Sequence, residues 1–433
     1  MTDGPFATTI RDTLHDRIPL DDAVVATIGT APFLRLDRIQ QLGFVSKVWP
    51  GAKHTRFEHS IGVYHLMRQG IDSLLRNCPN LTLSERGIRT ALAAALLHDI
   101  GHYPFSHAIE ELGPPVLPHE IVARRVIGST EIVSLLERDW DVDPGQVMEM
   151  IDTRNELPPE LRLLQDLLSG PLDVDKLDYL PRDAKACNVP YGGVDTPRLM
   201  DALRVEEVEG TSRIVVGEKG VSPLHSLINA RQEMFDNVYW HHTNRACMVM
   251  LLRAVQDSLA SGALTAQELT RLDDISLFAR LSQSDMPRST RELVDALQRR
   301  RIHKRAVEIS ARATDLYTYL GSLFYDPSGR RRLEKQIAGQ LGRQLQTAVA
   351  EHEVLIDLPK PEKWKTSVWV RFDRPPVGFR ELMPWVDVVG LEDADFKRYE
   401  EHRRMIRIVT TERLREEVNR RWEGLLLPLM TAR

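Results

Sequence analysis

Apolar residues recur at helical spacing through most of the chain. Over residues 58–203 they repeat every three or four positions, as in IRTALAAALLHDIGH and EIVSLLERDW, which is the period of a helix with one buried face. Proline and glycine at 113–115 and 158–159 mark loops between such helices. The same pattern continues over residues 224–263 and, as several helices joined by polar turns, over 273–350. We therefore expect a mainly α fold.

Two segments depart from the helical pattern. Between Arg204 and Val221 apolar and polar residues alternate around glycine-bearing turns, which predicts a β-hairpin inserted between helices. After Glu353 three short β-branched runs, VLIDLPKP, SVWVRF and RMIRIVTT, precede the helical ERLREEVNRRWEGLL. These runs predict a smaller α+β lobe at the end of the chain.

Composition places the chain among ordinary soluble globular proteins. Its 433 residues are 27% charged and 42% hydrophobic, a balance that excludes wholesale disorder. A net charge of -5 lacks the basic excess of a dedicated nucleic-acid coat. Residues 286–350 nevertheless hold thirteen Lys or Arg against six Asp or Glu. This region either binds a polyanion or forms a solvated helix face or a subunit contact.

The cysteines and the N-terminus indicate a cytoplasmic protein. Cys78, Cys187 and Cys247 are far apart and form no CxxC pair, which argues against a disulfide framework or a thiolate zinc site and fits a reducing compartment. The first twenty residues have no apolar core of signal-peptide length, and no run of 18 apolar residues follows. No membrane partner is expected.

Histidine is concentrated in one stretch that also carries carboxylates. Seven of the fourteen histidines lie between residues 54 and 119. His98 and Asp99 follow an apolar helix, where an adjacent imidazole and carboxylate are costly to bury without a partner. A divalent metal removes this cost if His59 and Asp175 supply further ligands, and imidazole with carboxylate suits Fe, Mn or Zn. Taken alone, the His-Asp dipeptide fits a structural ion pair better than a metal site, and only the distant motifs favour the metal.

Three long motifs carry a resemblance to a known family. HTRFEHSIG, LLHDIGHYPFSH and GPLDVDKLDYLPRD, in this order and spacing, resemble the HD-domain phosphohydrolases, specifically the deoxynucleoside triphosphate triphosphohydrolase branch. The similarity begins near APFLRLDRIQQLGF and fades after about residue 320. It implies a leader, residues 1–50, packing on the active site, and a catalytic HD-domain helical bundle, 51–350, with a β-hairpin near 204–221. A C-terminal α+β lobe, 351–433, would follow.

The resemblance implies a metal centre and a catalytic group. Fe, Mn or Zn would occupy the metal site, with Mg or Mn accompanying the substrate phosphates. The general acid toward the leaving 5′ oxygen would be His119, oriented by Glu110, which would also raise its pKa. His107 and His119 also fit simple hydrogen bonds to loop backbone. The implied metal ligands are His59, His98, Asp99 and Asp175, and the implied catalytic residues are His102, His107, Glu110 and His119.

Substrate contacts are implied in the same way. Guanidinium groups suit bidentate phosphate binding, while an amide and a carboxylate can bond a 3′ hydroxyl and an aromatic ring can exclude a 2′ hydroxyl. Leu42 and Tyr239 fit core packing equally well, and each cation alone fits a surface charge. The phosphate contacts would be Arg56, Lys176 and Arg231; the sugar and base contacts would be Gln41, Leu42, Tyr179, Asp183 and Tyr239.

Three functions are open at this point. The leading interpretation is metal-dependent hydrolysis of a deoxynucleoside triphosphate to deoxynucleoside and inorganic triphosphate. Within the same fold, the alternative is a phosphodiesterase or nuclease acting on nucleotide esters or single-stranded nucleic acid. From another class comes a non-catalytic nucleotide-binding assembly module. The resemblance alone implies a homo-oligomer.

Overall fold

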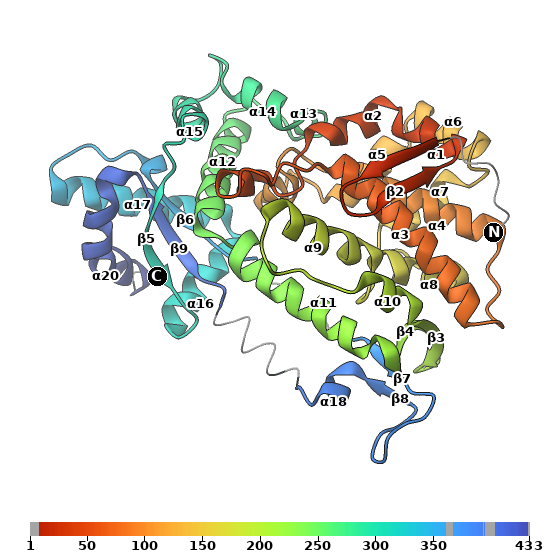
Figure 1. The fold of residues 1–433 in the computed structure, drawn as a ribbon. Helices are drawn as coiled ribbons and strands as arrows, with labels where there is room; N and C mark the ends of the chain where they lie inside the picture. The colour runs from red at the N-terminus through yellow and green to blue at the C-terminus, as the bar shows by residue number, and fades with distance from the viewer. Residues whose placement is uncertain (1–7, 361–366, 393, 395–402, 432–433) are drawn as a thin grey trace.

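The computed structural model describes residues 8–360, 367–392, 394 and 403–431. Helices predominate in this part of the chain, and a hairpin and two small sheets accompany them (Figure 1). The prediction of a mainly α fold with a β-hairpin and a smaller α+β lobe is confirmed. Among the described residues, no helix has both the length and the apolar character that crossing a bilayer requires.

The N-terminal segment lies against the helical bundle and has its own regular structure. An antiparallel hairpin, β1 (Thr8–Asp12) and β2 (Asp16–Leu20), comes first. Its buried Ile18 and Leu20 belong to the main hydrophobic core, so the hairpin is anchored by apolar burial. The elements that follow are α1 (Asp22–Ile28), α2 (Ala31–Leu34), η1 (Arg35–Arg38) and η2 (Gly43–Lys47).

Three helices form the centre of the bundle. α3 (Arg56–Asn77) packs against both α4 (Glu85–Leu97) and α9 (Val174–Cys187). Every residue of α4 from position 90 to 97 is buried. α3 and α9 approach closely at Gly62, where an added Cβ would lie 2.0 Å from Asp178 Oδ1. The surrounding helices are α5 (His119–Ile127), α6 (Thr130–Arg138), α7 (Pro144–Ile151) and α8 (Pro159–Ser169).

The predicted hairpin is present and is part of a larger sheet. β3 (Leu203–Val208) and β4 (Thr211–Gly217) pair in antiparallel register. β7 (Trp369–Arg371), the run predicted for the terminal lobe, pairs in parallel with β4 instead, and β8 (Leu382–Pro384) completes the order β3-β4-β7-β8. Around this sheet lie α10 (Thr196–Asp201), α11 (Val221–Met234) and α18 (Trp385–Val389).

A second sheet stands at the other end of the molecule. β9 (Ile406–Thr410) is its central strand, between β5 (Lys304–Ile309) and β6 (Val354–Asp357). The expectation of helices alone over 273–350 is wrong at β5, because its buried Ala306, Val307 and Ile309 stand among charged residues that mask the strand pattern. The helices of this region are α12 (His242–Ala260), α13 (Ala266–Leu269), α14 (Asp274–Leu281), α15 (Arg288–Gln298), α16 (Thr314–Ser322), α17 (Pro327–Leu345) and α20 (Arg415–Thr431).

Candidate active site

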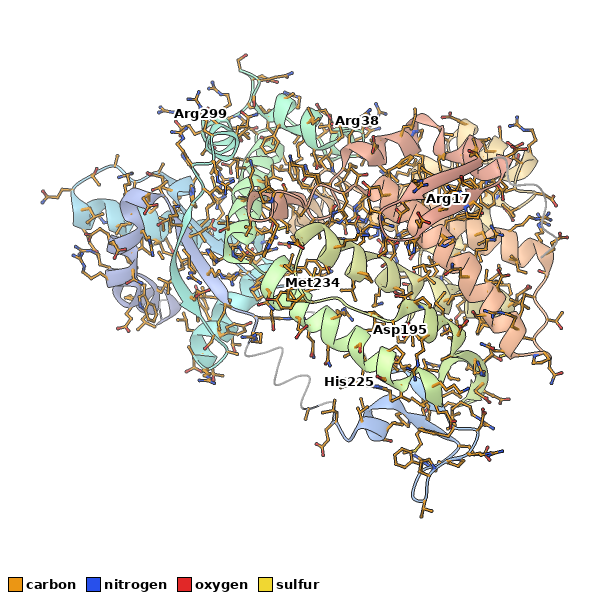
Figure 2. All side chains as sticks on the ribbon, in the orientation of Figure 1. Arg17, Arg38, Asp195, His225, Met234 and Arg299 are labelled. Atoms are coloured by element: carbon orange, nitrogen blue, oxygen red, sulfur yellow. The ribbon has the colours of Figure 1, made fainter. Side chains whose placement is uncertain are left out.

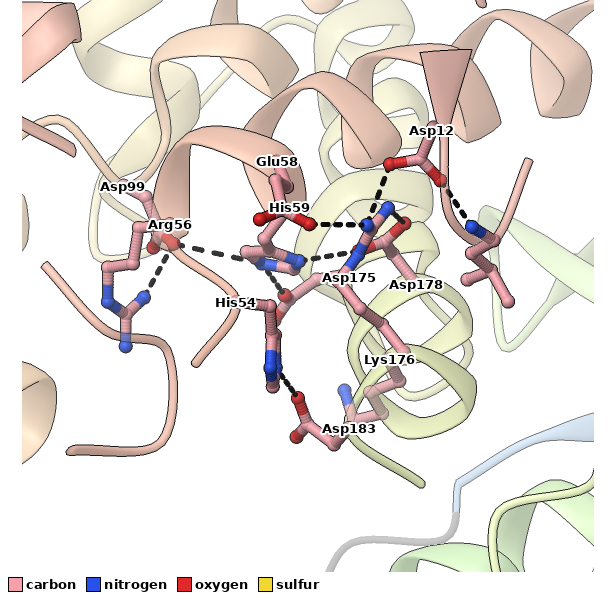
Figure 3. A network of polar contacts seen from close by, with 12 residues as sticks. Asp12, His54, Arg56, Glu58, His59, Asp99, Asp175, Lys176, Asp178 and Asp183 are labelled. Carbon is pink, nitrogen blue, oxygen red and sulfur yellow. Dashed lines mark hydrogen bonds and ion pairs between the residues drawn. The ribbon is translucent and has the colours of Figure 1, made fainter. Parts of the chain in front are cut away.

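The candidate metal ligands come from three helices and meet in one place. His59 lies in the first turn of α3, His98 and Asp99 follow the last turn of α4, and Asp175 lies in the first turn of α9. Figure 3 shows His59, Asp99 and Asp175 facing one another. The close packing of α3 against α4 and α9 brings these side chains together, although His59 and Asp175 are more than 110 positions apart in the sequence.

His59 is held with one ring nitrogen toward the protein and the other toward the site. Its Nδ1 lies 2.8 Å from Asp178 Oδ2, and its Nε2 lies 3.0 Å from Asp175 Oδ1 and 3.7 Å from Asp99 Oδ2. Burial alone would lower the pKa of His59, but the hydrogen bonds with Asp175 and Asp178 raise it to about 10. The carboxylates therefore favour a positive charge beside Nε2.

His98 presents a buried nitrogen that no group in the described part of the chain satisfies with a hydrogen bond. Its Nδ1 donates to the carbonyl oxygen of Ala95 at 2.8 Å, which leaves the lone pair on Nε2. That Nε2 has no hydrogen-bond partner in the described part of the chain, and it lies 3.4 Å from Asp99 Oδ1 and 3.9 Å from Asp175 Oδ1. An unpaired buried acceptor between carboxylates fits a divalent cation.

Three of the four candidate ligands form the tightest group. The ligand atoms of His59, His98 and Asp175 lie within 4.8 Å of one another. Asp99 borders this group, but Arg56 Nη1 lies 2.5 Å from its Oδ2, and His102 Nε2 lies 3.0 Å from its Oδ1. Burial would raise the pKa of Asp99, yet Arg56 and the neighbouring histidines hold it well below its usual range. The donor set fits a metal, with Asp99 also anchoring Arg56.

A buried carboxylate that sequence reasoning missed supports His59 from behind. Asp178 is fully buried and accepts from His15 Nε2 at 2.7 Å and from Arg182 Nε and Nη2 at 2.8 and 2.9 Å. Arg182 in turn bonds Asp12 at 2.7 Å. Burial would raise the pKa of Asp178, but Arg182 keeps it well below its usual range. A carboxylate behind a ligating histidine fixes the ring and increases its basicity.

The candidate general acid and its carboxylate are in contact. His119, the first residue of α5, places Nδ1 2.9 Å from Glu110 Oε1. Burial would lower the pKa of His119, but the Glu110 hydrogen bond raises it. The ring of His102 stacks on that of His119, with centroids 4.0 Å apart and planes 15° apart. Burial and the charges of Arg56 and His119 lower the pKa of His102 well below its usual value.

His107 has a more open position in the same cluster. Its side chain is 66% exposed, and its Nδ1 lies 3.9 Å from Glu110 Oε2. The four side chains offer ligand atoms within 4.8 Å of one another, so they form a second group of suitable size for a cation. The members of this group are His102, His107, Glu110 and His119.

The three predicted phosphate contacts differ in how closely they approach the candidate metal ligands and in which protein groups they already bond. Arg56 is buried at the site, where Nε donates to Ser106 Oγ at 2.8 Å in addition to the Asp99 bond. Lys176 Nζ is paired with Asp173 and donates to the Gly170 carbonyl at 3.1 Å, so its charge is engaged by protein oxygens in this structure. Arg231 lies on α11 and lowers the pKa of Tyr179 against a larger effect of burial, which places its charge near that ring.

The predicted sugar contacts gather around one carboxylate. Tyr239, at the end of the π-helical turn η5 (Phe235–Tyr239), donates its hydroxyl to Asp183 Oδ2 at 2.6 Å. His54 Nε2 holds the other oxygen at 2.7 Å. The rings of Tyr179 and Tyr239 lie 6.5 Å apart, edge to face. His54 is an addition to the predicted set, and its place as the first residue of the HTRFEHSIG motif is the only signal in the sequence.

The remaining pair of sugar contacts lies on the loop before α3. Gln41 donates its main-chain N–H to the His54 carbonyl at 3.0 Å, and its buried Oε1 has no hydrogen-bond partner among the described residues. An unpaired amide oxygen suits a ligand hydroxyl or amine. Leu42 is partly buried against the main core. Both positions are therefore beside His54 and the Asp183 carboxylate that it holds.

Comparison with known proteins relates most of the chain to one family. Residues 56–180 match the HD domain, and residues 194–426 match the HD associated region. A hypothetical protein from Aquifex aeolicus, known from its crystal structure, superposes with a TM-score of 0.71 at 25% identity, covering 96% of this chain and 99% of that one.

Sequence relatives include proteins with and without an assigned activity. An uncharacterized protein of Methanocaldococcus jannaschii is 32% identical over 70% of this chain and 60% of its own length. An uncharacterized protein of Bacillus subtilis is 33% identical over 61% of this chain and 63% of its own. The human deoxynucleoside triphosphate triphosphohydrolase SAMHD1 is 26% identical over 81% of this chain and 60% of its own. The chain thus spans less than two thirds of each of these relatives. With an HD domain followed by an HD associated region across most of its length, the chain belongs to the HD-domain family.

Proposed function

We propose that this protein hydrolyses deoxynucleoside triphosphates at the α-phosphorus, giving deoxynucleoside and inorganic triphosphate. The observation that carries the proposal is the unpaired, buried Nε2 of His98 beside His59 and Asp175, a donor set suited to a divalent cation, next to the His119–Glu110 pair. The HD domain supports a metal-dependent phosphohydrolase, and the name of the human relative supports the finer substrate class.

The metal would be held by His59, His98, Asp99 and Asp175. A divalent cation supplies water activation and Lewis-acid polarisation of the phosphoryl group at such a site. Fe, Mn or Zn fits the nitrogen and oxygen donors. Mg or Mn would accompany the substrate phosphates.

His119 is the proposed general acid. The Glu110 hydrogen bond keeps its ring protonated and oriented, so it can give a proton to the leaving 5′ oxygen. His102, neutral because its pKa is lowered, stacks beneath it and fixes the ring plane. Arg56, fixed by Asp99 and Ser106, contributes a guanidinium to an anionic substrate.

Deoxyribose selectivity is proposed to arise around Asp183. Its carboxylate, held by His54 and Tyr239, can accept from a 3′ hydroxyl. The buried amide of Gln41 can bond the same sugar, and Tyr179 lies between the Tyr239 ring and the His59 ring, 6.5 Å from each. A ring pressed against the 2′ carbon would leave no space for a ribose hydroxyl.

Two further expectations stay predictions. These are a cytoplasmic location and a homo-oligomeric state.

A phosphodiesterase is the second candidate, favoured by one observation. The group containing His102, His107, Glu110 and His119 is compact enough for a second cation, and paired metals serve phosphodiester cleavage. A polynucleotide substrate gains less support, because most cations of 286–350 already pair with carboxylates. These pairs are Arg288–Glu292, Arg299–Asp295, Arg301–Asp295, Lys304–Glu412, Arg305–Glu308, Arg331–Asp257, Arg332–Asp326 and Lys335–Glu351.

A substrate panel tests the proposal. The purified protein would be incubated, with Mn, Mg or Fe, with the four deoxynucleoside triphosphates, ribonucleoside triphosphates, cyclic nucleotides and a labelled single strand. We expect deoxynucleoside and triphosphate in equal amounts from at least one deoxynucleotide, and loss of both metal and turnover in Asp99→Ala. Cleavage of cyclic nucleotides or of the strand with intact deoxynucleotides would favour the phosphodiesterase instead.

A further inference from the structure

One buried carboxylate joins the two loops that flank the candidate active site. Asp274, the first residue of α14, is 6% exposed and lies in the HD associated region. The main-chain N–H of Phe105 donates to its Oδ1 at 2.7 Å, and the main-chain N–H of Gln40 donates to its Oδ2 at 3.0 Å. Both oxygens are therefore engaged by backbone from segments 65 positions apart.

Each of these loops carries residues of the proposed chemistry. Gln40 directly precedes the sugar and base contacts at 41 and 42, and Phe105 lies between His102 and His107. The two loops also touch directly, because Ser106 Oγ, which accepts from Arg56, donates to the Gln40 carbonyl at 3.0 Å.

The backbone at 105–106 needs external support. Phe105 and Ser106 have φ angles of 57° and 60°, two consecutive non-glycine residues in the left-handed region. Such a conformation persists only when surrounding groups fix it, and it recurs at functional sites. The ring of Phe105 stacks on Phe44 at 4.5 Å and meets Phe278 of α14 edge to face at 5.2 Å. α14 thus holds this turn by both apolar packing and the Asp274 carboxylate.

Neighbouring arginines hold the start of α14 against the same loops. Arg35 donates to the carbonyls of Leu272 and His102, each at 2.8 Å. Arg38, labelled in Figure 2, bonds Asp273 Oδ2 at 2.6 Å through its Nε. These bonds keep residues 272–274 in place, so the Asp274 oxygens are presented from a fixed support.

We propose that Asp274 is a positioning residue that sets the separation between the substrate loop at 40–42 and the catalytic turn at 102–107. This inference rests on the proposed function. Asparagine has one acceptor oxygen and an NH₂ donor, so Asp274→Asn cannot accept from both N–H groups. One loop loses its anchor, and the sugar contacts are no longer held at a fixed separation from His102, on which His119 stacks.

The control is Ser276→Ala in the same helix. Ser276 Oγ accepts from the Asp273 N–H and bonds the Asp273 carboxylate, so its loss weakens the start of α14 while keeping both Asp274 oxygens. We expect D274N to lower kcat/KM at least tenfold, with KM raised and kcat lowered, at unchanged metal content. S276A should lower thermal stability with KM and kcat within twofold. Equal kinetic losses in both variants would reduce Asp274 to a helix-stability role and overturn the proposal.

Amide hydrogen exchange separates this proposal from the proposed function. Peptides containing residues 40 and 105 should exchange at least tenfold faster in D274N, and at the wild-type rate in S276A. Unchanged exchange in D274N would overturn the proposal even if activity fell.

A second variant, D274E, keeps the proposal testable if D274N does not fold. Glutamate keeps two acceptor oxygens on a longer side chain, so D274E should retain slow exchange while kcat/KM falls. Wild-type kinetics in D274E would overturn the proposal. If the wild type hydrolyses no nucleotide, the proposed function fails. The exchange rates alone then show whether Asp274 holds the two loops together.

Discussion

Two stacked imidazoles with opposite protonation preferences lie at the centre of the proposed chemistry. Glu110 raises the pKa of His119, whereas burial and nearby positive charge lower that of His102. The rings are only 4.0 Å apart, so a second proton on the pair is disfavoured by like charge. The proton is therefore favoured on His119, the ring that contacts Glu110, which suits His119 to act as an acid.

Replacing Glu110 by Gln tests this arrangement through pH. The Glu110 carboxylate raises the pKa of His119 through its hydrogen bond and its charge, and the neutral amide of glutamine lacks that charge. The raised pKa keeps the acid protonated above the ordinary range of histidine, so the alkaline limb of kcat should move to lower pH in E110Q. Activity at pH 8 should fall more than at pH 6. Superimposable pH profiles would contradict the role of Glu110.

The sequence draws attention to residues inside long motifs but not to the side chains that support them. The four candidate ligands and the His119–Glu110 pair come together as the motifs imply. Asp178 lies in the same motif, three positions after Asp175. Its supporting role depends on contacts with His15 and Arg182, which only the tertiary structure brings to it. Asp274 is still less visible, because its partners are main-chain N–H groups.

The contact of α3 with α9 connects an element-level feature to the metal site. At Gly62 the added Cβ of alanine would lie 2.0 Å from Asp178 Oδ1 and 2.5 Å from Arg182 Nη2. Overpacking of this kind costs about 1–3 kcal/mol. We therefore expect Gly62→Ala to lower the free energy of unfolding by that amount and to weaken metal binding, since Asp178 orients His59.

Gly321→Ala is the matched control. Gly321 lies in α16 with no atom within 4 Å of an added Cβ, so alanine there should be neutral or stabilise by up to about 1 kcal/mol. Urea unfolding gives the stabilities, and titration with Mn²⁺ gives the metal affinity. Wild-type stability and metal affinity in G62A would show that α3 and α9 adjust without disturbing Asp178.

Periodic segments were the predictable elements. α3, α4 and α9 follow from their apolar spacing, and the β3–β4 hairpin from its alternation and turns. β5 was hidden because Lys304, Arg305 and Glu308 occupy its exposed positions, and a register shift between Arg305 and Val307 breaks the strand alternation. β7 has the expected strand character, but pairing with β4 depends on contacts more than 150 positions apart, which no local pattern contains.

A buried ionic bridge links the terminal lobe to the catalytic region. Arg245 of α12 bonds both oxygens of Glu111 at 2.8 and 3.0 Å, and bonds Asp357 of β6 at 2.7 Å. Glu111 adjoins Glu110, so the bridge supports the segment that orients His119. Burial would lower the pKa of Arg245, but the two carboxylates raise it beyond its usual range.

Arg245→Met leaves these two carboxylates without their partner. Removing one member of a buried ion pair costs about 3–5 kcal/mol, so we expect a loss of that size in urea unfolding and a lower kcat through displacement of Glu110. Arg299→Met is the control, since its pair with Asp295 is exposed and such pairs contribute about 0–1 kcal/mol. Equal stability of the two variants would show that the bridge is energetically unimportant.

Isotope transfer from water tests the central claim of attack at the α-phosphorus. The metal-loaded protein would turn over a deoxynucleoside triphosphate in H₂¹⁸O, with the triphosphate analysed by ³¹P NMR and the nucleoside by mass spectrometry. We predict that ¹⁸O enters the former α-phosphorus of triphosphate and that the deoxynucleoside carries none. Label in the deoxynucleoside, or monophosphate and pyrophosphate as products, would contradict the proposed reaction.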